Sequence, residues 1–333
     1  MGLKKQVGIM LAVVLGISGA ALADNVKKEE TKTFPMKAGG LIHLTANEGE
    51  IIIKSWDRDE VQLRMVKRAW GKSRREAEAR LEEIEVAIRH GRERLMIREI
   101  VPEHQRNGNI LRLFDRDFWE EEGWHSQVVD FELSVPRNIN LRIKGDESNV
   151  EISDIEGKIS IEVDEGDVVL SRVKSADMQI RLDEGDVALV HCEAPEQGIA
   201  KLDTDEGRIT LEGGRFDEVD LASDEGSLII DGAEIRRFWL SADEGDVEAI
   251  FIPRRDGAYR IEVDEGDIEI GLPASSELKV RLVAEEGRIE SAWNLRIREM
   301  EDGESAEGSL NGGNNGLLKA VSEEGDIFIR KNR

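Results

Sequence analysis

Cysteine is nearly absent from this chain of 333 residues, in which Cys192 is the only one. A single cysteine excludes an internal disulfide, so the fold must rest on packing and hydrogen bonds. Cations are also scarce, with 46 Lys and Arg against 71 Asp and Glu, which gives a formal net charge of −25. A surface this acidic repels nucleic acid and anionic lipid, and it favours cations, neutral glycans or basic surfaces as partners.

Long apolar runs are missing, apart from one short run near the N-terminus. Lys4 and Lys5 precede an apolar run over residues 7–17, and Ala21-Leu22-Ala23 then forms an A-x-A cleavage site. The run is too short for a comfortable helical anchor, which needs about 20 residues. Residues 1–23 are therefore predicted to be a signal peptide, with an uncleaved N-terminal anchor as the alternative. The protein is expected to be exported, and to be periplasmic or secreted with no transmembrane segment in the mature chain.

Catalytic and cofactor-binding motifs are missing as well. The sequence has no nucleophile elbow, P-loop or dinucleotide fingerprint, and its five histidines show no metal-ligand spacing. Glycan-cleaving β-helix enzymes need a few special carboxylates in a groove, whereas nearly all acids here belong to one repeated turn. We therefore expect no catalytic residue and no cofactor, and a polysaccharide-active β-helix enzyme remains an alternative.

The sequence does contain an Asp-Glu-Gly turn that recurs through its C-terminal two-thirds. Successive glycines of the turn are 19, 22, 19, 19, 21, 21 and 38 residues apart. A glycine reaches positive φ at no steric cost, so we expect each of them to turn the chain sharply. These corner glycines are Gly166, Gly185, Gly207, Gly226, Gly245, Gly266, Gly287 and Gly325.

Apolar and polar residues alternate on both sides of every corner. A period of two is the pattern of a half-buried strand, so each repeat holds one strand that enters the corner and one that leaves it. In the leaving strands, the apolar residues two positions after the glycines are Val168, Val187, Ile209, Leu228, Val247, Ile268, Ile289 and Ile327. In the entering strands, the matching residues are Ile161, Ile180, Leu202, Leu221, Leu240, Ile261, Leu282 and Ala320.

A period near 20 residues with two short strands predicts an all-β fold, a parallel β-helix or solenoid with coils of about 19–22 residues. Each coil adds one strand step of about 4.8 Å, so equivalent apolar residues stack into core columns. An antiparallel meander would explain the alternation but not the same turn on every second strand. Cys192 falls seven residues after its corner glycine, as do Val173, Ala233 and Ile252, and we expect this column to point inward.

Residues 24–135 differ from the repeats and are predicted to form a β-rich cap with one helix, before a solenoid over residues 136–333. Ser73 and Glu76 form a capping box at the start of an amphipathic helix over residues 73–90. An open sheet edge invites aggregation, so a solenoid needs such a cap.

The layout over residues 34–330 resembles a bacterial family of unknown function that carries the adhesin label and is related in style to head-GIN domains. The resemblance lies in the opening GGLIHLTANEGEIIIKSWDRDEVQL, the segment EAEARLEEIEVAI, the strand end ELSVP, and the reiterated xGD(V/I)xI turns. It implies a parallel β-helical protein that is exported or surface-associated. This sequence departs from it in showing no anchor, sorting signal or translocator barrel.

The first acid of each corner forms a column of like charges in a solenoid. Neighbours about 5 Å apart would repel by about 1 kcal/mol in water, and solvation or a divalent cation would relieve the repulsion. The column is therefore a candidate for weak Ca²⁺ binding, and a divalent-cation-binding structural solenoid is an alternative function. Its members are Asp164, Asp183, Asp205, Asp224, Asp243 and Asp264.

Tryptophan marks the candidate partner-binding positions. Trp119 and Trp124 lie in a polar insertion over residues 102–127, where they could instead plug the end of the solenoid. Trp239 falls in an outward column with Gln179, Lys201, Asp220, Arg260 and Arg281. Exposed Trp beside acids and Arg is typical of a binding face. The sequence thus predicts a non-catalytic, adhesin-like scaffold that binds an envelope or extracellular glycan or protein.

Overall fold

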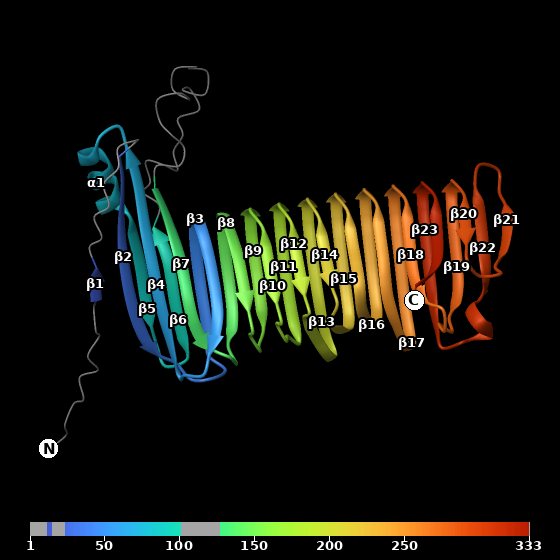
Figure 1. Cartoon of the computed structure of the whole chain (residues 1–333), viewed down its shortest axis with the longest axis horizontal. Coiled ribbons are helices and arrows are strands. Elements are labelled where there is room, and N and C mark those ends of the chain that lie inside the picture. Colours follow the sequence, from blue (N-terminus) through green and yellow to red (C-terminus); the bar gives the residue numbers. More distant parts are fainter. Residues whose placement is uncertain (1–11, 15–23, 101–126, 333) are drawn as a thin grey trace. The chain divides into compact units, whose positions relative to one another are not determined.

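The computed structural model describes residues 12–14, 24–100 and 127–332 of the chain. The chain divides into two compact units, residues 1–149 and residues 150–333. Both are built almost entirely of β-strands, with α1 as the one α-helix among the described residues (Figure 1). The prediction of an all-β fold is therefore confirmed.

The first unit is organised around strand β3 (Leu41–Trp56), which turns at Gly49, where φ is 127°. Its first half pairs in parallel with β6 (Arg94–Ile100), and its second half pairs in parallel with β7 (Gln127–Pro136). The start of β8 (Asn140–Ser153) lies beside the start of β3, where Asn140 N donates to Gly40 O at 2.9 Å. Antiparallel neighbours extend both halves: β5 (Glu85–His90) pairs with β6, and β4 (Glu60–Gly71), β2 (Asp24–Pro35) and β1 (Ala12–Val14) follow β7 in that order.

Helix α1 (Arg74–Glu83) begins at the predicted capping box. Glu76 N donates to Ser73 Oγ at 3.3 Å, and Lys72 N donates to a Glu76 carboxylate oxygen at 2.9 Å. The helix ends at Glu83, so its predicted extent to residue 90 is wrong. Residues 85–90 form β5 instead, because every one of them pairs in register with β6 and this pairing outweighs their helical spacing.

The second unit is a parallel β-solenoid, as the repeat predicts. Strands of each kind stack in parallel on the equivalent strand of the neighbouring coil. The entering strands are β9 (Ile159–Glu165), β11 (Asp177–Glu184), β13 (Glu193–Glu206), β15 (Arg215–Glu225), β19 (Lys279–Glu286), β23 (Gly316–Glu324) and the later parts of β16 (Leu228–Glu244) and β17 (Val247–Glu265). The leaving strands are β10 (Val168–Ser171), β12 (Val187–Val190), β14 (Ile209–Glu212), β18 (Ile268–Pro273), β20 (Ile289–Ser291), β24 (Ile327–Asn332) and the earlier parts of β16 and β17.

The predicted core columns lie inside the coils. Val168 pairs with Val187, Val187 pairs with Ile209, and the column continues in register with every member buried. Cys192 is fully buried, and burial raises the pKa of its thiol to about 11, so it is a core residue as expected.

The inward position expected for Ile252 is wrong, because this side chain is 49% exposed. Gly232, with φ 72°, adds one residue to β16 relative to β17 and shifts the register, so Ala233 pairs with Phe251. Phe251 is buried in place of Ile252 and packs against Phe238 and Tyr259.

The last coils are stacked in a different order from their order in the sequence. Strand β23 lies between β17 and β19, and β24 lies between β18 and β20, so the coil of Gly325 is inserted between those of Gly266 and Gly287 (Figure 1). Beyond β19, an antiparallel hairpin of β22 (Glu304–Ser309) and β21 (Arg296–Glu299) continues the sheet. Three of the four residues of β21 are charged, and such an outer strand disfavours pairing with another chain.

Candidate functional site

The corner glycines stack on one another with backbone in contact. Gly185 has φ 137°, and its N–H donates to Glu206 O at 2.9 Å in the next coil. A Cβ atom on Gly185 would lie 2.2 Å from Gly166 O. An added Cβ would likewise lie only 1.8–2.3 Å from the carbonyl oxygen of the neighbouring corner glycine at Gly207, Gly226, Gly245, Gly266, Gly287 and Gly325. The close approach of neighbouring coils therefore requires glycine at these corners, and the positive φ requires it at all of them except Gly287, where the expected positive φ is not found.

The six aspartates of the predicted metal column also stack one per coil, because the residues on either side of them pair in register. For example, Val163 pairs with Leu182 and Glu165 with Glu184, on either side of Asp164 and Asp183. Their side chains are exposed, apart from the half-buried Asp205. Across residues 24–100 and 127–332, no three His, Cys, Asp or Glu side chains are grouped in a way that could hold a metal. Binding of Ca²⁺ by the column stays a prediction.

That prediction has a direct thermal test. If the column binds Ca²⁺ in the native state alone, millimolar CaCl₂ should raise the unfolding midpoint by about 2 °C or more at ten times the Kd. NaCl at equal ionic strength is the control, because it screens the repulsion without binding. Equal stabilisation by the two salts, with no saturable heat in calorimetry, would leave screening as the whole effect.

The residue after the corner glycine, which is Asp in five coils, has a structural role that the sequence pattern did not reveal. The residue after the corner glycine uses its carboxylate to accept the backbone N–H of the equivalent residue in the next coil. Asp167 accepts from Asp186 N at 3.0 Å, and Asp186 in turn accepts from Arg208 N at 2.9 Å. The same bond recurs at Asp246, Asp267 and Asp326. These carboxylates satisfy N–H groups that would otherwise have no partner at the corner.

The outward face of the entering strands carries Trp239. Register places Trp239 of β16 between Asp220 of β15 and Arg260 of β17, as the sequence predicts. The column then continues through Lys319 of β23 to Arg281 of β19. Lys319 separates Arg260 from Arg281 because β23 is inserted between β17 and β19.

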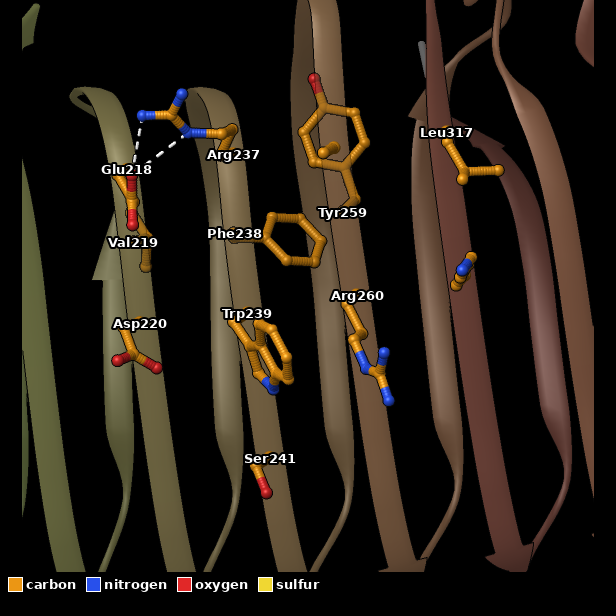
Figure 2. A pocket seen from close by; sticks show the side chains of 12 residues that line it. Glu218, Val219, Asp220, Arg237, Phe238, Trp239, Ser241, Tyr259, Arg260 and Leu317 are labelled. Carbon is orange, nitrogen blue, oxygen red and sulfur yellow. Dashed lines mark hydrogen bonds and ion pairs between the residues drawn. The ribbon is translucent and has the colours of Figure 1, made fainter. Parts of the chain in front are cut away.

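A groove of about 500 Å³ surrounds Trp239 on this face (Figure 2). The Trp239 side chain is 50% exposed, and Leu317 on the other side of the groove is 38% exposed. Ala258 pairs with Arg237 on one side and with Leu317 on the other. A small residue between larger ones leaves a hollow beside the indole, and volumes of about 300–1,000 Å³ suit small ligands.

Charges surround the indole in the groove. The Arg260 guanidinium lies 4.8 Å from the centre of the Trp239 ring and forms an ion pair with Glu262. Arg237 donates to Glu218 at 2.7 Å. Lys319 makes no ion pair with any residue in the described part of the chain. The groove therefore offers an aromatic platform with hydrogen-bond donors and acceptors around it and one ammonium free for a ligand.

Trp119 and Trp124 lie outside the described residues, as do residues 102–126 of the predicted insertion, whose last residue, Gln127, begins β7, so their predicted part in binding stays a prediction.

Beside the groove, a buried carboxylate that sequence reasoning did not single out holds three coils together. Asp217 of β15 is 1% exposed and accepts from Arg236 Nε at 2.5 Å, from Arg236 Nη2 at 2.6 Å and from Gln197 N at 2.9 Å. Arg237 and Arg254 lie 3.6 and 3.7 Å from its oxygens. The hydrogen bonds from Arg236 lower the pKa of Asp217. The sequence did contain a signal for this ion pair, because Arg236 follows Asp217 by 19 residues, which is the length of one coil and places the two residues in neighbouring coils.

Comparison with known proteins adds a family and two solved structures. The family model described as Toastrack DUF4097 matches residues 129–330. A crystal structure named "putative cell adhesion protein" from Clostridium sporogenes is 11% identical, with 92% of this chain and 100% of that chain covered and a TM-score of 0.28. One named "putative adhesin" from Bacteroides fragilis is 14% identical, with 91% and 97% covered and a TM-score of 0.41. No curated protein matches the chain. Among the described residues, no helix has the length and apolar character needed to span a bilayer.

Proposed function

The chain belongs to the Toastrack DUF4097 family, and from that premise we propose that it is a non-catalytic, adhesin-like solenoid scaffold that binds an envelope or extracellular partner. The partner is a glycan or a protein. The observation that carries the proposal is the groove around Trp239, where a half-exposed indole stands among charged side chains on an outward sheet face.

The chemistry of the groove supports binding better than turnover. An indole has a large rigid apolar face, and it contributes more to binding than most side chains when a partner covers it. The Arg260 side chain is already fixed by its position over the Trp239 ring and by its ion pair with Glu262. It therefore loses little conformational entropy when it donates a hydrogen bond to a ligand. The acids that line the groove, Glu218 and Asp220, each form an ion pair with a cation, which suits the positioning of a ligand better than proton transfer to it.

The solenoid also suits an extended or multivalent partner. Its coils repeat the same outward columns, and neighbouring coils differ by one strand step of about 4.8 Å. A partner with its own repeat can contact several coils at once, so weak contacts add to a strong attachment.

Export is part of this proposal, and it is supported by the order of basic residues, apolar run and A-x-A site over residues 1–23. The native protein is then expected to be periplasmic or secreted and to begin at Asp24, which mass spectrometry of its N-terminus measures. An intact Met1 on a cytosolic protein would contradict this part of the proposal.

Binding is tested with a glycan array and a pull-down from envelope and extracellular fractions, using the native protein and its Trp239→Ala variant. Truncation of a central aromatic anchor typically costs 2 kcal/mol or more, so we expect the affinity for the captured partner to fall about 30-fold or more. Trp119→Ala and Trp124→Ala test in the same assay whether the insertion takes part.

Ile252→Ala is the matched control, because Ile252 is 49% exposed in the same solenoid but does not line the groove. It should leave binding unchanged. A polysaccharide-cleavage assay runs alongside to test the enzyme alternative. Sustained cleavage of any glycan that is abolished by a single acid substitution in a folded protein, with no stable partner, would overturn the scaffold proposal.

A further inference from the structure

A second surface, in the first unit, carries an excess of positive charge. Arg89 of β5, Arg94 and Arg98 of β6, and Arg142 of β8 are all exposed, and we call them the basic face. Arg89 pairs across the sheet with Met96, Met96 pairs with His43, and Arg98 pairs with Thr45, so these side chains point to the same side of the sheet. Burial together with the charges of Arg142, Arg98, Lys144 and Arg94 lowers the pKa of His43, which pairs with Met96 on this side of the sheet.

None of the four arginines of the basic face forms an ion pair with a described residue. Several other arginines are matched with acids, for example Arg64 with Glu132 and Arg172 with Asp154. Like charges on neighbouring strands repel, and the one acid of β5 on this side, Glu85, lies opposite Ile100 and forms no ion pair with these arginines. In a chain with a net charge of −25, such a group of free guanidiniums is a site for an anionic partner.

Apolar side chains on the same face indicate the kind of anion. Along β6, Arg94, Met96, Arg98 and Ile100 share the outward side, and Met96 and Ile100 are each 38% exposed. Aliphatic chains suit the boundary between lipid headgroups and acyl chains, with arginines reaching the phosphates around them. A sugar ring is instead bound on an aromatic platform, which this chain presents in its other unit, at Trp239.

We propose that the basic face binds the surface of a bilayer that contains anionic phospholipids. Each guanidinium can donate two parallel hydrogen bonds to a headgroup phosphate, and Met96 and Ile100 pack against the glycerol and upper acyl region. The expectation that this chain repels anionic lipid follows from its net charge alone. Screening over about 8 Å at physiological salt lets a local cationic patch act independently of acids farther away.

The test is co-sedimentation of the native protein with vesicles of phosphatidylcholine alone and of phosphatidylcholine with 30% phosphatidylglycerol. We expect binding to the anionic vesicles only, weakening as NaCl is raised. Each arginine near an anionic surface contributes about fivefold to partitioning, so Arg94→Gln, Arg98→Gln and Arg142→Gln together should lower it about 100-fold. Met96→Ser with Ile100→Ser should lower it further, which attraction by charge alone would not produce.

The matched control is the triple variant Arg255→Gln, Arg296→Gln and Arg298→Gln, which removes three exposed arginines of the second unit and changes the net charge by the same amount. It should bind as the native protein does. Equal loss in the two triple variants, or no preference for anionic vesicles, would overturn the proposal. So would tight binding of a soluble anionic polysaccharide that the first triple variant loses while vesicles are not bound, because the partner would then be a glycan. Thermal unfolding of each variant checks that it is folded.

Discussion

Replacing Gly185 by Val should lower the free energy of unfolding by about 4 kcal/mol or more, or prevent folding. Two effects act together. At φ 137°, a β-branched residue is strained, and its Cβ would lie 2.2 Å from Gly166 O. The two coils cannot separate at this point without breaking the bond from Gly166 N to Glu184 O, along with the pairing of β9 with β11 before the corner. Chemical denaturation followed by circular dichroism measures the loss.

Gly232→Val is the control that separates the two effects. Gly232 also has a positive φ, 72°, but nothing lies within 4 Å of the Cβ atom that the substitution adds. Strain without overlap should cost about 1–3 kcal/mol. Similar losses for the two variants would show that close stacking of the corners contributes nothing, and an unchanged midpoint for Gly185→Val would contradict the corner structure itself.

The corner and its columns could be predicted from the sequence because each depends on local pattern. Period-two alternation decides which side chains face inward, and a repeated glycine fixes where the chain turns. One coil does not show the Asp-Glu-Gly repeat, because its corner has serine in place of glycine. Ser148 stands two residues before Val150, in the place that glycine occupies elsewhere, and Val150 pairs with Val168 like the other members of that column.

Stacking order could not be predicted in the same way. The corners at Gly287 and Gly325 have nearly the same local sequence, Glu-Glu-Gly, so either can stack on the coil of Gly266. The choice depends on pairing between distant segments, including the β21–β22 hairpin that occupies the free side of β19. The error at Ile252 has a similar origin, since one added residue at Gly232 turns the following side chains to the other face.

The candidate groove was therefore only half predictable. Trp239 could be placed on an outward face from its column alone. The groove also needs Leu317 and Lys319, which reach it because β23 is inserted beside β17. The cluster at Asp217 lies outside the corner columns, where alternation is irregular, and its partners become visible only when successive coils are aligned on one another.

Substitution of Asp217 in this cluster should have the second large effect on the free energy of unfolding. Asp217→Asn keeps the shape of the side chain but leaves Arg236 without a charge partner and with Arg237 and Arg254 close by. Removing one member of a buried pair typically costs 3–5 kcal/mol, and because Arg236 is 28% exposed we expect about 3 kcal/mol at pH 7. Denaturant unfolding of the two proteins at pH 7 measures it. Glu218→Gln is the control, since Glu218 also pairs with an arginine but is 42% exposed, and its loss should stay below about 1 kcal/mol.

The pH dependence of the difference between native protein and Asp217→Asn tests whether charge is the cause. Hydrogen bonds from Arg236 hold the pKa of Asp217 in the folded protein below its ordinary value of 3.8. A carboxyl with a depressed pKa stabilises the fold above the unfolded pKa, and this contribution is lost as the pH falls through the folded pKa. The gap between the two proteins should therefore be constant from pH 7 down to about 5 and close as the pH falls from 3.8 toward the lower pKa of folded Asp217, where the native side chain takes up the proton that makes it resemble Asn. A gap that stays constant to the lowest pH at which both proteins fold would mean that shape and packing, rather than the ion pairs, make Asp217 important.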